Sequence, residues 1–427
     1  MSPTEAILNN SAVADTPAAA RPDDFAHFDN YVMTTYGRFP IAIERGEGCR
    51  LWDTEGREYL DFVAGIATCT LGHAHPAMVA AATRQIQKLH HVSNFYYIPQ
   101  QGDLAQWIVD RSCADRVFFC SSGAEANEAA IKLARKYAHT VLDIKYPTIL
   151  TAQKSFHGRT LATITATAQP KYQENFDPLV PGFAYVPYND ITALEDAIGD
   201  IDEGDRRVGA ILIEPLQGEG GVRPGDLDYF LRLRKICDET GILLICDEVQ
   251  TGVGRTGKYW GYENLGIEPD IFTSAKGLAG GIPIGAMACK RSCDVFEPGN
   301  HASTFGGNPF ACAVALAVGQ TIEREDLLTN ARARGEQLRT RLRAIAQQRP
   351  DVFVDVRGWG LIDGMEIAEE AELTSIEVVK AAMERGLLIA PAGPKVLRFV
   401  PPLTVSAEDI DRAADILTEV LDANYAR

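Results

Sequence analysis

The regular alternation of short apolar segments with amphipathic ones between residues 116 and 290 most constrains the fold. The apolar runs have the length of buried strands, and the stretches between them carry apolar residues at helical spacing. The expected strands are 116–120, 148–153, 208–215, 242–249, 271–276 and 284–290, and the expected helices are 122–138 and 228–241. Strands and helices that alternate in this way predict an α/β fold, with a mainly parallel mixed sheet flanked by helices.

The pattern changes near residue 313, where longer charged helices and a second set of strand-like segments begin. We expect a large domain over 76–313, a smaller α/β domain over 314–427, and an N-terminal segment, 28–75, that packs with the smaller domain. Residues 1–27 are rich in Ala, Pro, Asp and Ser and lack the features of a secretory or transit peptide. They are predicted to form a flexible tail.

Composition excludes several classes of function. A formal net charge of -17 argues against nucleic-acid binding, which needs a basic surface. No apolar run approaches the length of a membrane span. The nine cysteines are scattered singly, without a CxxC pair, which favours a reducing compartment and predicts a cytoplasmic protein. His73 and His75 have an HxH spacing, but no further ligands assemble with them, so we expect a turn there and no metal site.

The stretch SSGA, after the strand 116–120, is a candidate anion site. Ser122, Gly123 and Ala124 open a helix, whose free N–H groups and positive dipole end attract a phosphate. Gly123 permits close approach of the ligand. Taken alone, the turn fits a serine-capped helix equally well.

The stretch LLICDEVQTGVGRTG carries an acid, Asp247, to the end of an expected central strand. A carboxylate at such a position is costly unless it faces a cation. The stretch also contains a literal GxGxxG, residues 252–257, which is the basis of an alternative, an NAD-dependent oxidoreductase. That motif requires a strand that ends at the first glycine and a helix that starts at the last, and neither is expected here.

Lys276 stands at the end of the strand IFTSA, among small residues that leave room around its amine. The ordinary interpretation is a solvated lysine. However, the ends of parallel strands meet at one edge of a sheet, which would place Lys276 near Asp247 and the SSGA turn. A partly desolvated lysine loses its proton more readily and reacts with carbonyls. A phosphate site, an acid for a ring nitrogen and a reactive lysine together predict an enzyme that uses pyridoxal 5′-phosphate (PLP).

The chain resembles the class III (ornithine/GABA-type) aminotransferases of PLP fold type I. Matching stretches cover nearly everything after residue 28 and include SSGAEANEAAIKLAR, KSFHGRTLAT, EPLQGEGG, DEVQTGVGRTG, TSAKGLAGGIPIGA and HASTFGGNPFACA. The resemblance implies that Lys276 binds the cofactor covalently and moves the proton of the reaction. It also implies that Asp247 pairs with the ring nitrogen, that Gln250 lies near the ring hydroxyl and that Phe156 stacks on the ring, although an aromatic residue is otherwise most often core.

The same resemblance assigns the phosphate and the substrate. Ser122, Gly123 and Ala124 hold the phosphate, and Thr304 reaches the phosphate of a partner subunit, which implies an obligate homodimer with shared sites. The residues implied in substrate binding are Arg159 for the distal carboxylate, the switch pair Glu219 and Arg398, and also Tyr36 and Ser303. In the switch, Glu219 neutralises Arg398 while the amino donor is bound, and Arg398 is freed for the α-carboxylate of 2-oxoglutarate.

The resemblance implies transfer of the terminal amino group of N2-acetylornithine to 2-oxoglutarate, giving N-acetylglutamate 5-semialdehyde and glutamate, in arginine biosynthesis. The close alternatives are 4-aminobutyrate or ornithine as the donor, or a succinylornithine or lysine-pathway substrate. An aminomutase fits less well, because the carboxylate-binding arginine and the switch pair are both present. A catalytically silent binding protein on the same scaffold is a third class.

Overall fold

The computed structural model describes residues 25–202 and 204–424. The predicted flexible tail, 1–27, lies almost wholly outside the described residues. Contacts divide the chain into two compact units, of which the first comprises the residues up to 45 together with 51–58. The second unit comprises 46–50 and all residues from 59 onward, and every site residue discussed below except Tyr36 belongs to it.

The first unit contains the helix α1 (Ala26–Tyr31) and most of β1 (Ile43–Glu47) and β2 (Arg50–Asp53). In the second unit, β3 (Glu58–Asp61) pairs in parallel with β15 (Leu387–Leu388) through Leu60 and Leu387. The domain boundaries expected at residues 76 and 314 stay predictions.

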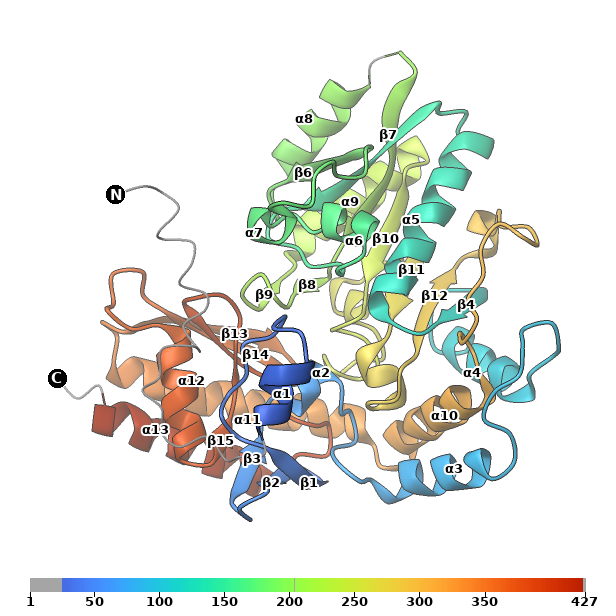
Figure 1. Ribbon diagram of the computed structural model, residues 1–427. Helices are drawn as coiled ribbons and strands as arrows, with labels where there is room; N and C mark the ends of the chain where they lie inside the picture. Colours follow the sequence, from blue (N-terminus) through green and yellow to red (C-terminus); the bar gives the residue numbers. More distant parts are fainter. Residues whose placement is uncertain (1–24, 203, 425–427) are drawn as a thin grey trace. The chain divides into compact units, whose positions relative to one another are not determined.

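The second unit contains a seven-stranded sheet, called here the central sheet (Figure 1). Its strands, in spatial order, are β4 (Arg116–Cys120), β12 (Gly285–Cys289), β11 (Ile271–Ser274), β10 (Leu243–Asp247), β7 (Arg206–Ile213), β5 (Tyr146–Ala152) and β6 (Phe183–Val186). Only β12 runs antiparallel to its neighbours, so β4 points the same way as β11 and β10. The predicted mainly parallel mixed sheet is confirmed.

The helix α5 (Gly123–Thr140) lies along the sheet, as Figure 1 shows. Its alanine- and leucine-rich face packs on alternate residues of the central strands, which include Leu243 and Ile245 of β10. The small alanines let the helix approach the strands closely, and the resulting apolar cluster is almost completely buried. The helices α8 (Ile191–Ile201) and α9 (Leu227–Thr240) also contact the strands, and α9 ends at Gly241 in the left-handed conformation.

The remaining elements connect or follow the sheet. Those before residue 300 are α2 (Ala64–Ala67), α3 (Pro76–Ile86), α4 (Pro99–Val109), α6 (Leu161–Ala166), α7 (Pro170–Gln173), β8 (Leu216–Gln217), β9 (Arg223–Pro224) and the 3₁₀ helices η3 (Gly261–Leu265), η4 (Lys276–Ala279) and η5 (Arg291–Cys293). Those after it are α10 (Pro309–Arg324), α11 (Leu327–Gln348), β13 (Phe353–Trp359), β14 (Ile362–Ile367), α12 (Ser375–Glu384), β16 (Ala390–Pro391), β17 (Val396–Phe399) and α13 (Ala407–Asn424). Strands β13, β14, β17 and β16 form a separate four-stranded sheet.

Among the described residues, none of the helices combines the length and the apolar composition that crossing a bilayer requires. All nine cysteines carry free thiols.

Candidate active site

The carboxyl ends of β4, β10 and β11 meet at one edge of the central sheet, and a cavity of about 400 Å³ opens there. The cavity lies beyond three segments that are far apart in sequence. Its lining includes eight of the predicted site residues, namely Ser122, Gly123, Ala124, Phe156, Arg159, Asp247, Gln250 and Lys276. The expected convergence of three strand ends on one edge is therefore confirmed.

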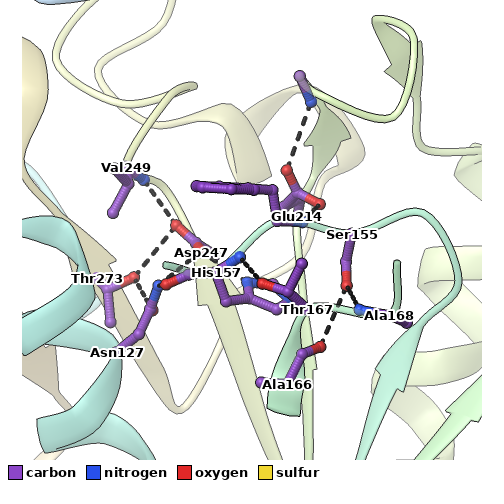
Figure 2. A network of polar contacts seen from close by, with 12 residues as sticks. Asn127, Ser155, His157, Ala166, Thr167, Ala168, Glu214, Asp247, Val249 and Thr273 are labelled. Carbon is purple, nitrogen blue, oxygen red and sulfur yellow. Dashed lines mark hydrogen bonds and ion pairs between the residues drawn. The ribbon is translucent and has the colours of Figure 1, made fainter. Parts of the chain in front are cut away.

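Asp247 is the last residue of β10, and only 4 % of it is exposed. Its Oδ2 accepts a hydrogen bond from Asn127 Nδ2 at 2.8 Å and lies 2.7 Å from His157 Nδ1 (Figure 2). Its Oδ1 accepts from the backbone N–H of Val249 at 3.0 Å and, at 3.4 Å, from the Thr273 hydroxyl. These donors hold both carboxylate oxygens in fixed positions, which is the arrangement that an electrostatic partner of a bound cation needs.

His157, Asn127 and Thr273 were not identified from the sequence. Two of them follow from regular geometry. Asn127 lies one helical turn beyond Gly123 and so faces the same side of α5, while Thr273 is the register partner of Asp247 in the parallel pair β10–β11. His157 carried no such signal, since it lies in an irregular segment after β5. Its Nδ1 donates to Asp247, and its Nε2 has no hydrogen-bond partner among the described residues.

Lys276 begins the short helix η4, two residues beyond the end of β11, and it has a positive φ of 38°. A left-handed backbone is strained for any residue except glycine, and such strain concentrates at functional sites. The sequence suggested that the small residues around Lys276 leave open space, but the structure shows that they do not. A Cβ on Gly277 would lie 2.5 Å from the Thr70 hydroxyl, and one on Gly280 would lie 2.8 Å from Met78. The residues after Lys276 are small because other side chains pack closely against them.

Burial lowers the pKa of the Lys276 amine below its usual value, and the nearby Arg398 guanidinium acts in the same direction. The charges of Glu219 and Asp247 oppose this shift without cancelling it. Lys276 forms no salt bridge in the described part of the chain. A larger fraction of such an amine is unprotonated near neutral pH than of a solvated lysine, which is what attack on a carbonyl requires.

The SSGA turn serves as a helix cap and as an open N-terminus at once. The Ser122 hydroxyl accepts from the Glu125 N–H at 3.2 Å, as the simpler interpretation of the turn required. Gly123 and Ala124 occupy the first positions of α5, where backbone N–H groups have no partner inside the helix. A Cβ on Gly123 would lie 2.8 Å from the side chain of Val249, which follows β10, so only glycine fits this close approach.

Glu214 is a buried carboxyl group in the lining that sequence reasoning missed. Burial and the charge of Asp247 raise its pKa well above its usual range. Its two oxygens accept from the N–H groups of Phe156 at 3.3 Å and Gly218 at 3.4 Å. Glu214 thereby joins the segment that carries Phe156 to the hairpin that carries Glu219.

The predicted switch pair is in contact. Arg398 Nη1 donates to Glu219 Oε1 at 2.5 Å, and it also donates to Gln250 Oε1 at 3.2 Å. Only 2 % of Arg398 is exposed. Burial acts to raise the pKa of Glu219, but Arg398 and Lys276 outweigh it and hold that pKa below its usual value. Glu219 is therefore ionised and neutralises Arg398 in this structure.

The other substrate residues divide into two groups. Arg159 lines the cavity, with its guanidinium carbon 3.9 Å from the ring centroid of Tyr172 and 5.4 Å from that of Phe156. Ser303 and Thr304 do not line it, and Thr304 is exposed. Tyr36 belongs to the first compact unit, where 73 % of it is exposed. The roles of these residues stay predictions.

The GxGxxG stretch forms consecutive turns and begins no α-helix. Its Arg255 is buried, and the Nη1 of Arg255 donates to the carbonyl of Leu361 at 3.0 Å and to that of Pro401. The stretch thus joins the central sheet to the C-terminal strands and does not form a dinucleotide-binding turn.

His73 and His75 both make structural contacts at the turn that was expected there. His75 caps α3, because its Nδ1 accepts from the Ala77 N–H at 3.3 Å, and His73 Nε2 lies 2.7 Å from Asp61 Oδ2. Over residues 25–202 and 204–424, no three His, Cys, Asp or Glu side chains gather as a metal site would require.

The hydrogen bond from Asp61 raises the pKa of His73 from 6.5 to about 9. A raised pKa means that protonated His73 stabilises the fold fully below pH 6.5 and that this contribution is lost as the pH rises through about 9. We expect His73→Gln to lower the free energy of unfolding by about 1–2 kcal/mol near pH 6, since part of the interaction is screened by solvent. Urea unfolding at several pH values measures this. A difference between variant and parent that does not shrink toward high pH would contradict the assignment.

Comparisons with known proteins identify the family of the chain. The family model described as aminotransferase class-III matches residues 31–421. The chain is 72 % identical over 411 residues to the acetylornithine aminotransferase of Synechocystis sp., with 96 % of each chain covered. The ornithine aminotransferase structure from Toxoplasma gondii ME49 is 34 % identical, with a TM-score of 0.89 and 99 % of each chain covered. The N-acetylornithine aminotransferase structure from Stenotrophomonas maltophilia K279a is 36 % identical, with a TM-score of 0.80, and covers 93 % of this chain and 98 % of its own.

The fold is that of the PLP-dependent aminotransferases of fold type I. Within that class, the chain belongs to the class-III aminotransferases. The family assignment excludes the oxidoreductase as an interpretation of the sequence.

The residues present fit PLP. The cavity offers open N–H groups at the start of α5 for a phosphate, and a buried carboxylate, Asp247, for a protonated ring nitrogen. Phe156 offers an aromatic face, and Lys276 offers an amine whose pKa is lowered. The cavity volume of about 400 Å³ is in the range of pockets that hold small-molecule ligands, as PLP and a small substrate are.

Proposed function

We propose that the protein transfers the terminal amino group of N2-acetylornithine to 2-oxoglutarate. The observation that carries the chemistry is the meeting of Lys276, Asp247 and the SSGA turn in one cavity, beside a charge-neutralised arginine, Arg398. Identity of 72 % with proteins called acetylornithine aminotransferase supports this donor.

When bound, PLP supplies an aldehyde that bonds to amines and a ring that withdraws electrons from the carbon next to the nitrogen. The side chains do the rest. Asp247, fixed by Asn127 and His157, keeps the ring nitrogen protonated. The amine of Lys276 would hold the cofactor covalently and, once free, would move a proton at the substrate carbon that bears the transferred nitrogen.

The switch pair gives the two substrates one site. An ω-amino donor carries no carboxylate at its reacting carbon, and the Glu219–Arg398 pair leaves no net charge there. A 2-oxo acid does carry one, and Arg398 binds it bidentately when Glu219 turns away. Arg159 lies beside the rings of Phe156 and Tyr172, and in this proposal it binds the carboxylate at the far end of either substrate.

Donor choice is tested by kcat/KM for N2-acetylornithine, ornithine and 4-aminobutyrate, each with 2-oxoglutarate as the acceptor. We expect the value for N2-acetylornithine to exceed the others by at least about tenfold, because a site built around a distal group discriminates against donors that lack it. A higher value for ornithine or 4-aminobutyrate would replace the donor and leave the aminotransferase chemistry intact.

We also propose a homodimer in the cytoplasm, in which Thr304 contacts the phosphate in the partner's site. Phe95, Tyr97 and Phe305 are 92 %, 104 % and 62 % exposed, and exposed apolar side chains of this kind mark interfaces. Asn94 Nδ2 donates to the carbonyls of Ser303 at 3.2 Å and Gly306 at 3.0 Å, so the aromatic segment and the loop of Thr304 are one surface. The free thiols support a reducing compartment.

Subunit complementation tests the shared site. Lys276→Ala and Thr304→Glu chains are each expected to be inactive alone, the second because a carboxylate repels the phosphate. Co-refolded at equal amounts, they should recover about a quarter of the parental activity, because half of the dimers are hybrids with one intact site each. No recovery from a mixture that does form hybrid dimers would show that Thr304 serves its own chain's site.

A further inference from the structure

The hairpin that carries Glu219 is held by a side chain outside the cavity. Glu219 lies in the tip, residues 218–222, between β8 and β9. From β13, Arg357 donates through Nη2 to the carbonyl of Gly221 at 2.6 Å and through Nε to the carbonyl of Val222 at 2.8 Å. One guanidinium therefore binds two successive backbone carbonyls just beyond the switch glutamate.

The same guanidinium is anchored on its other side. Arg357 Nη1 donates to Asp355 Oδ2 at 2.7 Å and forms an ion pair with Glu366 of β14. Its side chain is only 14 % exposed. The guanidinium is planar and has five donors in a fixed geometry, so two carboxylates hold it in one orientation. It therefore fixes the carbonyls of the tip to the four-stranded sheet of β13, β14, β17 and β16.

The backbone of the tip needs such support. Val222 has a φ of 49° and Gly221 a φ of 106°, and a positive φ is especially unfavourable for a β-branched residue. The Val222 side chain is fully buried in an apolar cluster with Ile362 and Val396. Gly364 makes room for it, since a Cβ there would lie 2.8 Å from the Val222 Cβ. Surrounding contacts maintain a strained conformation of this kind, and the Arg357 bonds are among them.

We propose that Arg357 is a positioning residue for the switch, which sets how firmly Glu219 neutralises Arg398. The inference rests on the proposed function of that pair. With the tip held, exchange between the two substrates requires only the Glu219 side chain to leave Arg398. With the tip loose, Glu219 competes less well for Arg398, and the arginine is more often free to bind an α-carboxylate. Arg357 thereby determines the preference for donors without a carboxylate at the reacting carbon.

Half-reactions of the holoenzyme provide the test. The absorbance of the bound cofactor is followed after mixing with N2-acetylornithine alone, and separately with L-glutamate alone. In Arg357→Met, the ratio of kcat/KM for glutamate to that for N2-acetylornithine should rise about tenfold, because charge-assisted bonds to the tip are lost. Arg357→Lys should restore part of the ratio. Equal slowing of both half-reactions is what a merely structural role would give, and it would overturn the proposal.

A double-mutant cycle shows whether Arg357 acts through Glu219. Glu219→Gln should itself raise the ratio, and adding Arg357→Met to it should change the ratio little further. Arg223→Met is the matched control. Arg223 lies 3.7 Å from the same Glu366, but within the described residues its guanidinium donates no hydrogen bond to a carbonyl of the tip. That variant should keep the parental ratio, and additive effects of Arg357→Met and Glu219→Gln would contradict the proposal.

A readout independent of substrate is hydrogen exchange of the holoenzyme over residues 217–222, whose intrinsic exchange a change at residue 223 does not alter. Faster exchange there in Arg357→Met, with the parental rate in Arg223→Met, is expected. Unchanged exchange overturns the proposal whatever the substrates are. A parental holoenzyme that reacts with neither donor instead refutes the proposed function, and in that case the exchange experiment still decides whether Arg357 holds the tip.

Discussion

Lys276→Ala is expected to lower kcat for transamination by at least about 10³-fold, because the change removes both the covalent anchor of the cofactor and the base that moves the proton. No second amine lines the cavity among the described residues. The variant should still bind PLP through its phosphate and ring contacts, but borohydride should leave the cofactor permanently attached to the parental chain only. Steady-state kinetics and the mass of the reduced protein measure the two effects.

Lys154→Ala is the matched control for this prediction. Lys154 also has a positive φ, of 63°, and lies just after a strand of the same sheet, but it is exposed and does not line the cavity. Its replacement should leave kcat and cofactor attachment unchanged, which separates the chemistry of the Lys276 amine from the effect of losing a strained lysine. A Lys276→Ala protein with the parental rate would refute the mechanism.

Asp247→Asn is expected to lower kcat by about 10²–10³-fold, because the change removes a negative charge from a nearly dry site. A neutral amide does not keep the ring nitrogen protonated. It also turns a donor toward the N–H groups of Asn127 and His157, which now meet a carboxylate. The kcat of each half-reaction, followed by cofactor absorbance, measures the loss, and KM is expected to change less than kcat.

Asp270→Asn is the corresponding control. Asp270 lies just before β11, at the opposite edge of the same sheet, and it accepts from Arg234 Nη1 and from the Leu244 N–H. Loss of its charge should lower stability and spare kcat. If the two variants lost activity equally, the effect of Asp247 would be attributed to folding and not to the ring nitrogen.

Much of the fold was predictable because the local sequence pattern of many segments agrees with the element that each segment forms. The run LLICD is apolar on both sides and short, as a central parallel strand must be, and it forms β10 with Asp247 as its last residue. The strand 116–120 was predicted with both bounds correct, since RVFFC is followed at once by the small residues that open α5. The motifs placed Asp247, Lys276 and Gly123 at strand ends, and the rule that parallel strands share one edge brought them together.

The error at Lys276 shows where sequence reasoning fails. Small residues after the lysine suggested open space, yet Gly277 and Gly280 are small because Thr70 and Met78 press against them. Thr70 is more than two hundred positions away in the chain, so no local pattern relates it to Gly277. His157 was missed for a related reason, because only the folded loop turns its ring toward Asp247.

By itself, the sequence determined the α/β class, the edge of the sheet where the chemistry lies and the kind of cofactor, because these depend on periodicity and on which residues end each strand. The tertiary structure alone decided how those residues are held: the donors around Asp247, the positive φ of Lys276 and the clamp of Arg357 on the hairpin of Glu219. Such contacts join segments far apart in the chain. Their geometry is set by the packing of whole elements against one another, which no short stretch of sequence encodes.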